Sequence, residues 1–330
     1  MKNKSEKILV TGGAGYIGSH MVLKLLEANY QPIIVDNLST GLKHFVPHGV
    51  PLYVFNIGEK AKLSHLLAME KFDAVMHFAA STEVNESIKK PEKYYQNNFG
   101  NTLNLLEVMS EYNLKNCIFS STAAIFGESE HGTVHESHPK NPMNPYGYSK
   151  LMCERLLQDF DKAYGIKSVC LRYFNAAGAD IHGRTGYQTH RVSHLIPITL
   201  QAARGKRKQI EVFGRDYPTL DGTCIRDYIH VMDLCNAHLL ALNYLMSGGD
   251  SRQYNLGNGK GYSVQQIIDI TKKVTNMDFE IFDAPRRLGD TAKMISDTRL
   301  VRQELGWEPC YSEIETIIQH AWQWEKAANI

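Results

Sequence analysis

The stretch ILVTGGAGYIGSH, from Ile8 to His20, decides the fold of this chain. Its three apolar residues at Ile8–Val10 predict a short buried strand, and a helical pattern begins before the stretch ends. Three glycines separate the two, in the spacing G-x-x-G-x-x-G: Gly12, Gly15 and Gly18. Such glycines let the backbone turn tightly and approach a pyrophosphate, which the N-terminus of the helix then stabilises. The alternative is a glycine-rich turn that serves only close packing.

The next predicted strand, Ile33–Val35, is followed by Asp36, which lies 18 residues beyond Gly18. An acid at this position can accept hydrogen bonds from the ribose hydroxyls of an adenosine. Its carboxylate would repel a 2′-phosphate, so the spacing favours NAD over NADP. The alternative is a loop acid that caps a local turn. Because the acid follows a strand, a glycine loop and a helix, we expect the chain to bind NAD.

Short apolar strands alternate with longer helical patterns through the first half of the chain. The strands are expected at Ile8–Val10, Ile33–Val35, Leu52–Phe55, Ala74–Phe78, Cys117–Ser120 and Val169–Arg172. The helices are expected near Ser19–Ala28, Ala61–Glu70, Tyr94–Glu111 and Pro145–Tyr164. This alternation predicts an α/β fold, a Rossmann-type doubly wound parallel sheet with helices on both faces.

The alternation loosens after about Gly178, where Gly, Arg, His and Pro punctuate the sequence more often. We therefore expect an NAD-binding Rossmann domain over residues 1–178 and a smaller α/β substrate domain over residues 179–330. Part of residues 226–260 is a candidate to pack back on the first domain.

The composition narrows the function classes. A net charge of +1 over 330 residues gives no global field that would recruit nucleic acid or an anionic membrane. No stretch approaches the ~20 apolar residues of a membrane helix, and the apolar run in MKNKSEKILVTGG is too short for a signal peptide. The six cysteines form no C-x-x-C pair and no zinc spacing, so we expect no metal and a reducing compartment, the cytoplasm.

The stretch PYGYSK, from Pro145 to Lys150, contains two tyrosines and one lysine. On a helix, residues four apart lie one turn above each other, so Lys150 meets Tyr146 and Tyr148 points elsewhere. A positive charge beside a phenol favours the phenolate. We therefore expect Tyr146 to do chemistry and Tyr148 to lie at the surface or in a dimer contact.

The hydroxyl triplet Ser120-Ser121-Thr122 directly follows the strand Cys117–Ser120. The C-terminal ends of strands face the ligand crevice in an open parallel sheet. A hydroxyl, a phenol and an ammonium beside a nicotinamide form a site that oxidises a hydroxyl to a carbonyl. The alternative for Thr122 is a hydroxyl that caps the following turn.

These motifs resemble the extended short-chain dehydrogenase/reductase family. The resemblance includes the glycine loop, Asp36, FAAS at Phe78–Ser81, the SST triplet and Tyr146-x-x-x-Lys150. More narrowly, the chain resembles the UDP-galactose 4-epimerases from residue 7 nearly to its end. The specific matches are LRYFNAAGA (Leu171–Ala179), FGRDYPTLDGTCIRDYIHVMDL (Phe213–Leu234) and RRLGD (Arg286–Asp290).

The resemblance implies a UDP-glucose 4-epimerase, in which Tyr146, helped by Thr122, would remove the proton of a sugar 4-hydroxyl while NAD takes the C4 hydride. Related dehydratases place an acid pair where this chain has Ala123 and Ala124, so dehydration is disfavoured. Two alternatives stay open. One is a 4-epimerase of another UDP-sugar, namely a UDP-N-acetylhexosamine, UDP-pentose or UDP-uronate, and the other is a non-catalytic NAD-binding sensor.

The resemblance also implies a set of site residues and a homodimer formed through Tyr94–Glu111 and Tyr146–Tyr164. The catalytic residues would be Tyr146, Lys150 and Thr122. The cofactor residues would be Gly12, Gly15, Tyr16, Ile17, Gly18, Asp36, Asn37, Asn56, Ile57, Phe78, Ala79, Ala80, Asn98, Ser120, Tyr146, Lys150 and Tyr173. The UDP-sugar residues would be Thr122, Tyr146, Asn175, His194, Leu195, Phe213, Arg226, Arg287, Asp290 and Met294.

Several positions depart from the family pattern. Asn56 replaces an aspartate that faces the adenine, and we expect it still to accept from the amino group. Thr82 replaces a lysine found in some members, and Gly100-Asn101 inverts the common Asn-Gly order. His194 stands where some members have asparagine, and Met294 falls at a residue that gates the sugar pocket.

Overall fold

The computed structural model describes residues 6–129, 132–189, 192–287 and 289–328. Residues 1–5 of the segment considered as a signal peptide, and Leu288 of RRLGD, lie outside the described residues. The chain divides into two compact units. The first consists of Met1–Ile125, Pro142–Arg172 and Cys235–Tyr254, and the second of Phe126–Asn141, Tyr173–Leu234 and Asn255–Ile330.

The first unit is built on a seven-stranded sheet in the order β11-β7-β5-β4-β1-β2-β3. Its strands are β1 (Lys7–Thr11), β2 (Gln31–Asp36), β3 (Leu52–Val54), β4 (Ala74–His77), β5 (Asn116–Thr122), β7 (Lys167–Tyr173) and β11 (Arg252–Leu256). The neighbours from β3 through β5 pair in parallel, with β1 between β2 and β4. This order confirms the predicted Rossmann-type doubly wound sheet.

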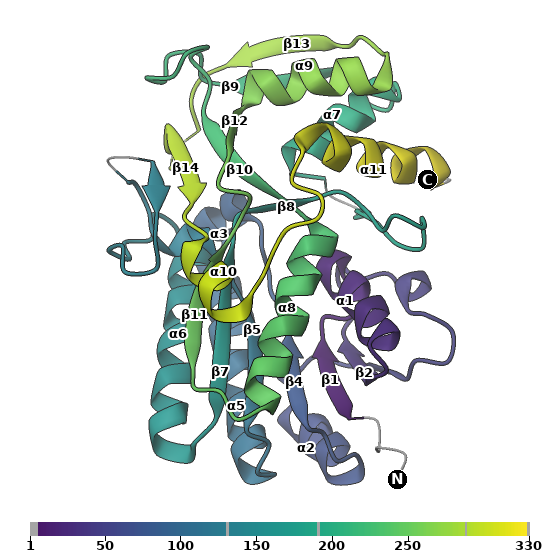
Figure 1. Cartoon of the computed structure of the whole chain (residues 1–330), viewed down its shortest axis with the longest axis vertical. Coiled ribbons are helices and arrows are strands. Elements are labelled where there is room, and N and C mark those ends of the chain that lie inside the picture. Colours follow the sequence, from purple (N-terminus) through teal and green to yellow (C-terminus); the bar gives the residue numbers. More distant parts are fainter. Residues whose placement is uncertain (1–5, 130–131, 190–191, 288, 329–330) are drawn as a thin grey trace. The chain divides into compact units, whose positions relative to one another are not determined.

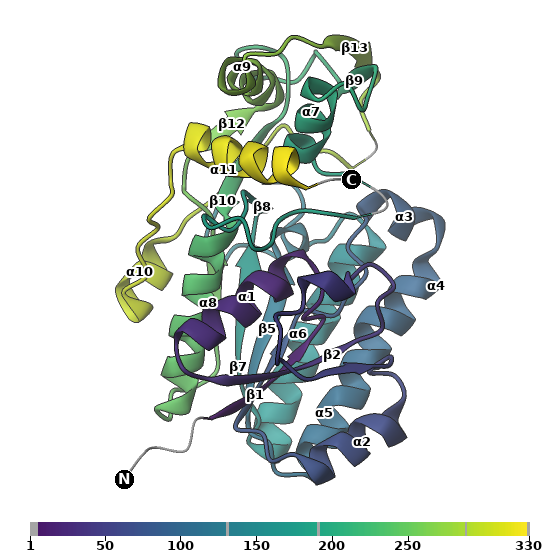
Figure 2. The same ribbon diagram turned by 90° about the vertical axis from the view of Figure 1, so that its right-hand side faces the viewer.

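Helices cover both faces of this sheet (Figures 1 and 2). The helices on one face are α1 (Tyr16–Glu27) and α8 (Val231–Met246); those on the other are α2 (Lys60–Met69), α5 (Asn101–Glu111) and α6 (Pro145–Tyr164). The second face buries a continuous apolar core in which Leu9, Val75 and Phe119 of the strands pack with Leu63 and Leu105 of the helices. The apolar strands therefore form the centre of the unit, as their composition predicts.

Local sequence explains the helix that carries PYGYSK. Asn144 caps its N-terminus by accepting from Gly147 N, Pro145 occupies the first turn, and Gly165 ends the helix with φ 67°. The predicted bounds Pro145–Tyr164 are confirmed.

The predicted helix Tyr94–Glu111 is not one regular helix. It consists of the end of α4 (Pro91–Tyr94), a π-helical turn η2 (Tyr95–Gly100) and α5. A π-helical turn inserts an extra residue and occurs mainly at functional sites. Two short helices complete the unit near this point, α3 (Val84–Lys89) and the 3₁₀ turn η3 (Ala123–Ile125), and a 3₁₀ turn η1 (Lys43–Phe45) follows β2.

The second unit contains one sheet of five strands and one of two. The first holds β6 (Thr133–Val134), β8 (Asn175–Ala177), β10 (Ile225–His230), β12 (Gly261–Ser263) and β14 (Lys293–Ser296); the second holds β9 (Gln209–Phe213) and β13 (Glu280–Ala284). Its helices are α7 (Leu195–Ala203), α9 (Val264–Thr275), α10 (Arg299–Leu305) and α11 (Ile314–Ala327). Ile196, Tyr228, Ile267 and Ile318 form its core. In the described part of the chain, no helix combines the length and apolar character needed to cross a membrane.

Candidate active site

The glycine loop after β1 has a geometry that only glycine permits at two positions. Gly12 has φ +73°, and a Cβ added there would lie 2.6 Å from Ala79 N. A Cβ on Gly18 would collide with the carbonyl oxygen of Gly12. Gly12 N donates to Val35 O over 2.8 Å, which fixes the loop across β1 and β2. The loop therefore brings backbone close to the C-terminal ends of β1 and β4, where the strand order reverses and ligands bind in such sheets.

The loop and the helix that follows fit a pyrophosphate. Gly15 is the N-cap of α1, no side chain caps the helix, and its first turn carries no acid. An added Cβ on Gly15 would meet only Gly12 O, at 3.3 Å, among the described atoms considered around it. Tyr16 and Ile17 open the helix. The backbone is thus open at a helix N-terminus, where anions are stabilised.

Asp36 lies at the end of the second strand, as the sequence predicts, and its side chain is buried. Its two carboxylate oxygens accept from Ala14 N over 3.0 Å and from Leu38 N over 2.8 Å. Burial raises the pKa of Asp36, and these two backbone hydrogen bonds oppose the rise. Each carboxylate oxygen keeps further acceptor capacity, so the residue both supports the loop and fits an adenosine ribose. Asn37, its neighbour, accepts from Ser39 N over 3.0 Å.

The predicted adenine end lies after β3. Oδ1 of Asn56 accepts from Gly58 N over 2.8 Å and from Asn101 Nδ2 over 3.0 Å. Both lone pairs of this oxygen are therefore used within the chain, and the amide nitrogen is the remaining polar group of Asn56. Ile57 beside it is buried. Sequence reasoning missed Asn101, whose contact joins two positions that depart from the family pattern.

The segment after β4 is tied to α6 by Asn98. Phe78, Ala79 and Ala80 begin this segment, and Phe78 N donates to Thr11 O over 2.9 Å. The buried Asn98 amide accepts from Ser81 N over 2.8 Å and donates to Ser81 O and to Ser149 Oγ, each over 3.0 Å. Asn98 thus holds this segment at a fixed place beside the helix that carries the predicted catalytic residues.

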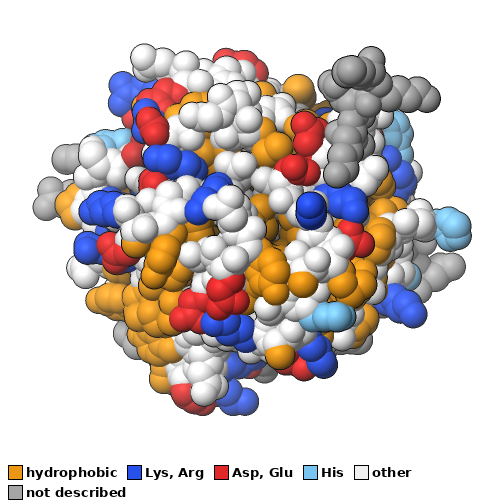
Figure 3. All heavy atoms as spheres, turned by 90° about the horizontal axis from the view of Figure 1, so that it is seen from below, with side chains coloured by type: hydrophobic (Ala, Val, Ile, Leu, Met, Phe, Trp, Pro, Cys, Tyr) orange, Lys and Arg blue, Asp and Glu red, His pale blue; other side chains and the backbone are white. Residues whose placement is uncertain are grey.

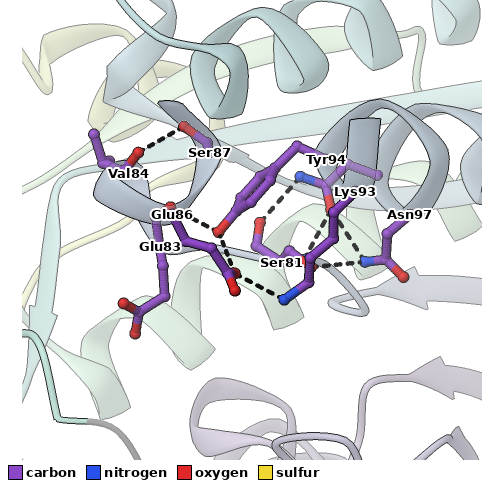
Figure 4. Close-up of polar contacts among 9 residues, drawn as sticks. Ser81, Glu83, Val84, Glu86, Ser87, Lys93, Tyr94 and Asn97 are labelled. Carbon is purple, nitrogen blue, oxygen red and sulfur yellow. Dashed lines mark hydrogen bonds and ion pairs between the residues drawn. The ribbon is translucent and has the colours of Figure 1, made fainter. Parts of the chain in front are cut away.

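A second set of contacts fixes the same segment (Figure 4). Tyr94 Oη donates to Glu83 O over 2.6 Å and also lies 3.0 Å from Glu86 Oε2, which Lys93 Nζ reaches over 2.7 Å. The buried Tyr94 ring meets the Tyr146 ring edge-on, with 6.4 Å between centroids and 80° between planes. Sequence reasoning did not identify Tyr94 as a site residue, because nothing in its local pattern reveals this long-range contact.

The two tyrosines of PYGYSK have different environments. Tyr146 is 9% exposed, and the Thr122 hydroxyl acts on its phenol to lower the pKa that burial raises, whereas Tyr148 is 43% exposed. Thr122 Oγ1 also accepts from Ala124 N over 3.1 Å. Thr122 therefore caps the following turn, which was the alternative interpretation of this hydroxyl, and its catalytic role stays a prediction. The structure brings Tyr146 and Thr122 together and leaves Tyr148 at the surface of its unit.

Lys150 lies one turn beyond Tyr146 and is almost completely buried. Its Nζ donates to Ser120 O over 2.8 Å and lies 4.7 Å from the centroid of the Phe119 ring. Burial lowers the pKa of Lys150 to about 8. Burial also raises the pKa of Tyr146, and the Thr122 hydrogen bond opposes that rise. Burial thus favours the protonated phenol of Tyr146, and a nearby positive charge would favour its ionisation.

The second unit gathers five of the ten predicted UDP-sugar residues, four of them around the carboxylate of the fifth, Asp290. Asp290 accepts from Arg287 Nε over 2.9 Å and from Arg226 Nη2 over 3.4 Å. The Arg287 guanidinium lies 4.6 Å from the centroid of the Phe213 ring. Met294 on β14 is the direct cross-strand partner of Arg226 on β10. Two guanidinium groups, a ring and a carboxylate therefore converge, which suits a nucleoside diphosphate.

Three predicted substrate residues lie elsewhere in the second unit. Asn175 on β8 donates from Nδ2 to Asp227 O over 2.9 Å, one residue along β10 from Arg226. His194 precedes α7 and Leu195 begins it, and the His194 ring meets the Tyr187 ring edge-on at 5.5 Å. The predicted cofactor residue Tyr173 is the last residue of β7. Over the described ranges, no group of three His, Cys, Asp or Glu side chains is placed to hold a metal ion.

Known proteins resemble this chain over most of its length. Residues 8–257 match the sequence model of the NAD dependent epimerase/dehydratase family. A UDP-glucose 4-epimerase of Halalkalibacterium halodurans is 49% identical, over 97% of this chain and 95% of the relative. The crystal structure of UDP-glucose 4-epimerase from Brucella ovis in complex with NAD has TM-score 0.94 and 41% identity, covering 97% of this chain and 98% of that one. The UDP-Glc/GlcNAc 4-epimerase of Campylobacter jejuni has TM-score 0.86 and 43% identity, covering 98% and 100%.

Proposed function

The chain belongs to the NAD dependent epimerase/dehydratase family, and we propose that it is a UDP-glucose 4-epimerase that interconverts UDP-galactose and UDP-glucose. The observation that carries the proposal is a buried set of three side chains. Tyr146 and Lys150 lie one turn apart on α6, and Lys150 Nζ donates to Ser120 O over 2.8 Å. Burial raises the pKa of Tyr146, and the buried hydroxyl of Thr122, two residues further along β5, acts to lower it. The positions after Thr122 are Ala123 and Ala124, which cannot transfer a proton. This set can take and return one proton, which epimerisation needs, but it lacks the further acid and base that elimination of water needs.

In the proposed reaction, Tyr146 removes the proton of the sugar 4-hydroxyl and Thr122 orients that hydroxyl. Bound NAD would supply reversible hydride transfer at the sugar C4, the chemistry that inversion through a 4-keto sugar needs. Lys150 supplies positive charge that favours the phenolate of Tyr146. Tyr146 then gives the proton back to the sugar oxygen, so the protein ends in the protonation state in which it began.

We assign the dinucleotide to the first unit and the UDP group to the second. Gly15 and Asp36 would hold the NAD pyrophosphate and adenosine ribose, and Asn56 would lie by the adenine. Arg226 and Arg287 would bind the UDP phosphates, because guanidinium groups match phosphate oxygens in bidentate fashion. The remaining proposed roles are Asp290 at the uridine ribose, Phe213 at the uracil, Asn175, His194 and Leu195 near the diphosphate and sugar, and Met294 at the sugar pocket. Tyr173 would contact the cofactor.

We also propose a homodimer formed through the helices of the first unit. Large apolar side chains remain exposed on or beside α3, η2 and α6: Val84, Ile88, Tyr95, Met143, Tyr148 and Met152. Hydrophobic side chains gather along the left of the face seen in Figure 3, the side on which α6 lies in Figure 1. The six cysteines, all within the described residues, form no disulfide and five of them are buried, which suits the cytoplasm that we expect as the compartment.

A second candidate function is a 4-epimerase that also accepts UDP-N-acetylhexosamines. The similar protein of Campylobacter jejuni acts on both kinds of sugar by its description. Met294, at the proposed sugar pocket, is half-buried and carries a flexible side chain that can adapt to ligands of different size.

The proposed function is tested by incubating the protein separately with UDP-galactose, UDP-N-acetylgalactosamine and UDP-glucuronate, without added cofactor, and identifying the products. We expect conversion of UDP-galactose to UDP-glucose. Conversion of the acetylated sugar would add the second candidate function, and conversion of the uronate alone would replace the proposed substrate. Absence of any conversion, even with NAD added, would overturn the proposed function and favour a non-catalytic NAD-binding protein.

A further inference from the structure

The end of β5 is bonded to one face of α6 through three consecutive residues, Ser120–Thr122. The carbonyl of the first residue accepts from Lys150 Nζ over 2.8 Å, and the hydroxyl of the third acts to lower the pKa of Tyr146, which burial raises. The middle residue, Ser121, donates from Oγ to Glu154 Oε1 over 2.6 Å. Tyr146, Lys150 and Glu154 are spaced by four, so they lie on one face of the helix. The proposed catalytic residues account for two of these connections, and Ser121 with Glu154 makes the third.

Glu154 is itself held by Arg172 on β7, the strand beside β5. Arg172 donates from Nε to Glu154 Oε1 over 2.9 Å and from Nη2 to Oε2 over 2.6 Å. The side chains are 1% and 2% exposed, respectively. This is a bidentate pair, the geometry that fixes orientation best. The two hydrogen bonds from Arg172 therefore fix the orientation of the Glu154 carboxylate, which also accepts from the Ser121 hydroxyl.

A fully buried ion pair is a poor device for stability alone, because removing both charges from water offsets most of their attraction. Well-packed apolar side chains of similar volume often stabilise a protein as much or more. The contribution of the Glu154–Arg172 pair is therefore better explained by the residues that it holds in position. Its carboxylate reaches the residue between Ser120 and Thr122, whose own contacts hold Lys150 and Tyr146.

Glu154 also supplies negative charge to the surroundings of Lys150. The titratable groups that face or act on Lys150 come from β4, β7 and α6: His77, Cys170, Tyr146, Cys153 and Glu154. Burial lowers the pKa of His77 to about 3 and raises the pKa of Cys153 to about 11. Burial raises the pKa of the Cys170 thiol well above its ordinary value. At neutral pH these neighbours are uncharged, so among these described groups Glu154 is the carboxylate that favours the ammonium of Lys150.

We propose that Ser121, Glu154 and Arg172 are positioning residues for the epimerase reaction: Arg172 fixes Glu154, and Glu154 fixes α6 against the end of β5 through Ser121. The proposal rests on the proposed function and deepens it. Its consequence is that the Thr122–Tyr146 contact and the Lys150–Ser120 contact share one rigid frame. A shift of α6 along β5 would lengthen both at once, and catalysis is sensitive to displacements of this size.

The first test is Ser121→Ala, which removes the hydroxyl and leaves the ion pair intact. We expect kcat on UDP-galactose to fall at least tenfold with little change in KM, because the variant alters the placement of the reacting groups. Ser168→Ala is the matched control, since Ser168 is a buried serine near the start of β7. It should leave kcat within about twofold of the wild type, and both variants should keep nearly the wild-type melting temperature.

The second test separates positioning from plain structural support through the pH profile. Glu154→Gln removes the negative charge near Lys150, so the pKa of Lys150 should fall. The alkaline limb of kcat should then move to lower pH, a change that mere loosening of the fold would not cause. The paired variant Glu154→Leu with Arg172→Met removes both charges without leaving one unpaired. It should fold and lose at least tenfold in kcat; if it does not fold, Ser121→Ala decides.

Wild-type turnover of UDP-galactose is measured first in the same series. Its absence would overturn the proposed function. With the wild type active, a kcat within twofold of wild type in Ser121→Ala, together with an unmoved alkaline limb in Glu154→Gln, would overturn the positioning role. A loss of kcat in Ser121→Ala that the control does not share, with a shifted limb in Glu154→Gln, would establish it.

Discussion

The side chains of Asn56 and Asn101 hydrogen-bond to each other, with Nδ2 of Asn101 donating to Oδ1 of Asn56 over 3.0 Å. Gly58 N donates to the same oxygen, and Asn101 Nδ2 also reaches Asn97 Oδ1 over 3.2 Å. Asn56 lies after β3 and Asn101 begins α5, so residues 45 positions apart meet at the proposed adenine end. Two departures from the family pattern are therefore one local arrangement, in which Asn101 takes up the acceptor that Asn56 would offer the adenine.

Replacing Asn56 by aspartate should tighten NAD binding. A carboxylate could keep the bonds from Gly58 N and Asn101 and still accept from the adenine amino group through its further lone pairs. A hydrogen bond to a charged group contributes about 1.5–3 kcal/mol, so we expect roughly a tenfold lower Kd. The measurement is fluorescence titration of NAD into cofactor-stripped protein. Asn101→Ala, which frees one lone pair, should shift Kd in the same direction, and weaker binding by both variants would contradict the assignment.

Tyr146→Phe should abolish turnover while NAD binding persists. Loss of a general acid–base group costs about 10²–10⁴-fold in rate, and the phenyl ring keeps its contact with Tyr94. The matched control is Tyr148→Phe, two residues away on the exposed side of the same helix. Turnover is followed by coupling UDP-glucose formation to its oxidation. Equal rates for Tyr146→Phe and the wild type would rule out the proposed role of this phenol.

The activity should decline as pH rises through the pKa of Lys150, which burial lowers to about 8. Above that pH the ammonium is lost, and the phenolate of Tyr146 loses its nearby positive charge. The profile of kcat against pH measures this limb. Lys150→Arg should retain little activity, because a planar guanidinium does not fit the position of the ammonium at Ser120 O. The guanidinium stays charged, so the remaining activity should not decline at alkaline pH. A wild-type kcat that stays constant to well above pH 8 would contradict this account.

Lys150 should also make the folded state less stable at neutral pH. Its pKa is about 8 in the folded protein and 10.5 ordinarily, so between these values the unfolded chain binds more protons. The cost of burying the ammonium is therefore complete below about pH 8 and disappears as pH rises to 10.5. It is on the order of 3 kcal/mol.

The variant Lys150→Met removes this titration. The free energies of unfolding of the variant and the wild type are measured in urea over a range of pH. The variant's value minus that of the wild type should be largest below about pH 8 and should shrink at higher pH. A difference that does not depend on pH would show that the lysine is not destabilised by burial. The expected result is a variant that is inactive yet relatively more stable at neutral pH.

Arg287→Ala should weaken binding of the UDP-sugar and leave the chemical step largely intact. Charge-assisted hydrogen bonds contribute about 1.5–3 kcal/mol, so KM should rise roughly 10- to 100-fold. Arg286→Ala is the matched control, because the Arg286 guanidinium lies over the Tyr217 ring and pairs with Asp216 rather than Asp290. Steady-state kinetics on UDP-galactose provide both constants. If the two variants raise KM equally, the assignment of the phosphate contact to Arg287 is wrong.

Local sequence determined the fold class and the central chemistry of this protein. The glycine spacing with Asp36 predicts a dinucleotide loop, and the four-residue spacing of Tyr146 and Lys150 places them on one helix face, because helix and strand periods are properties of short segments. The same reasoning separated Tyr146 from Tyr148. It also missed the π-helical turn of η2, because residues 95–100 carry too few apolar side chains for a change of helical phase to show in the sequence.

Only the tertiary structure decided which distant side chains meet. The contacts of Asn56 with Asn101, of Tyr94 with Tyr146, and of Glu154 with both Ser121 and Arg172 join separate elements. They depend on which elements the fold makes neighbours, as when β7 lies beside β5 although β6 separates them in the chain. Burial also depends on the tertiary structure. The pKa of Lys150 is lowered because the packed first unit excludes water from its ammonium. Sequence periodicity carries no information on either, since both arise from packing between segments far apart in the chain.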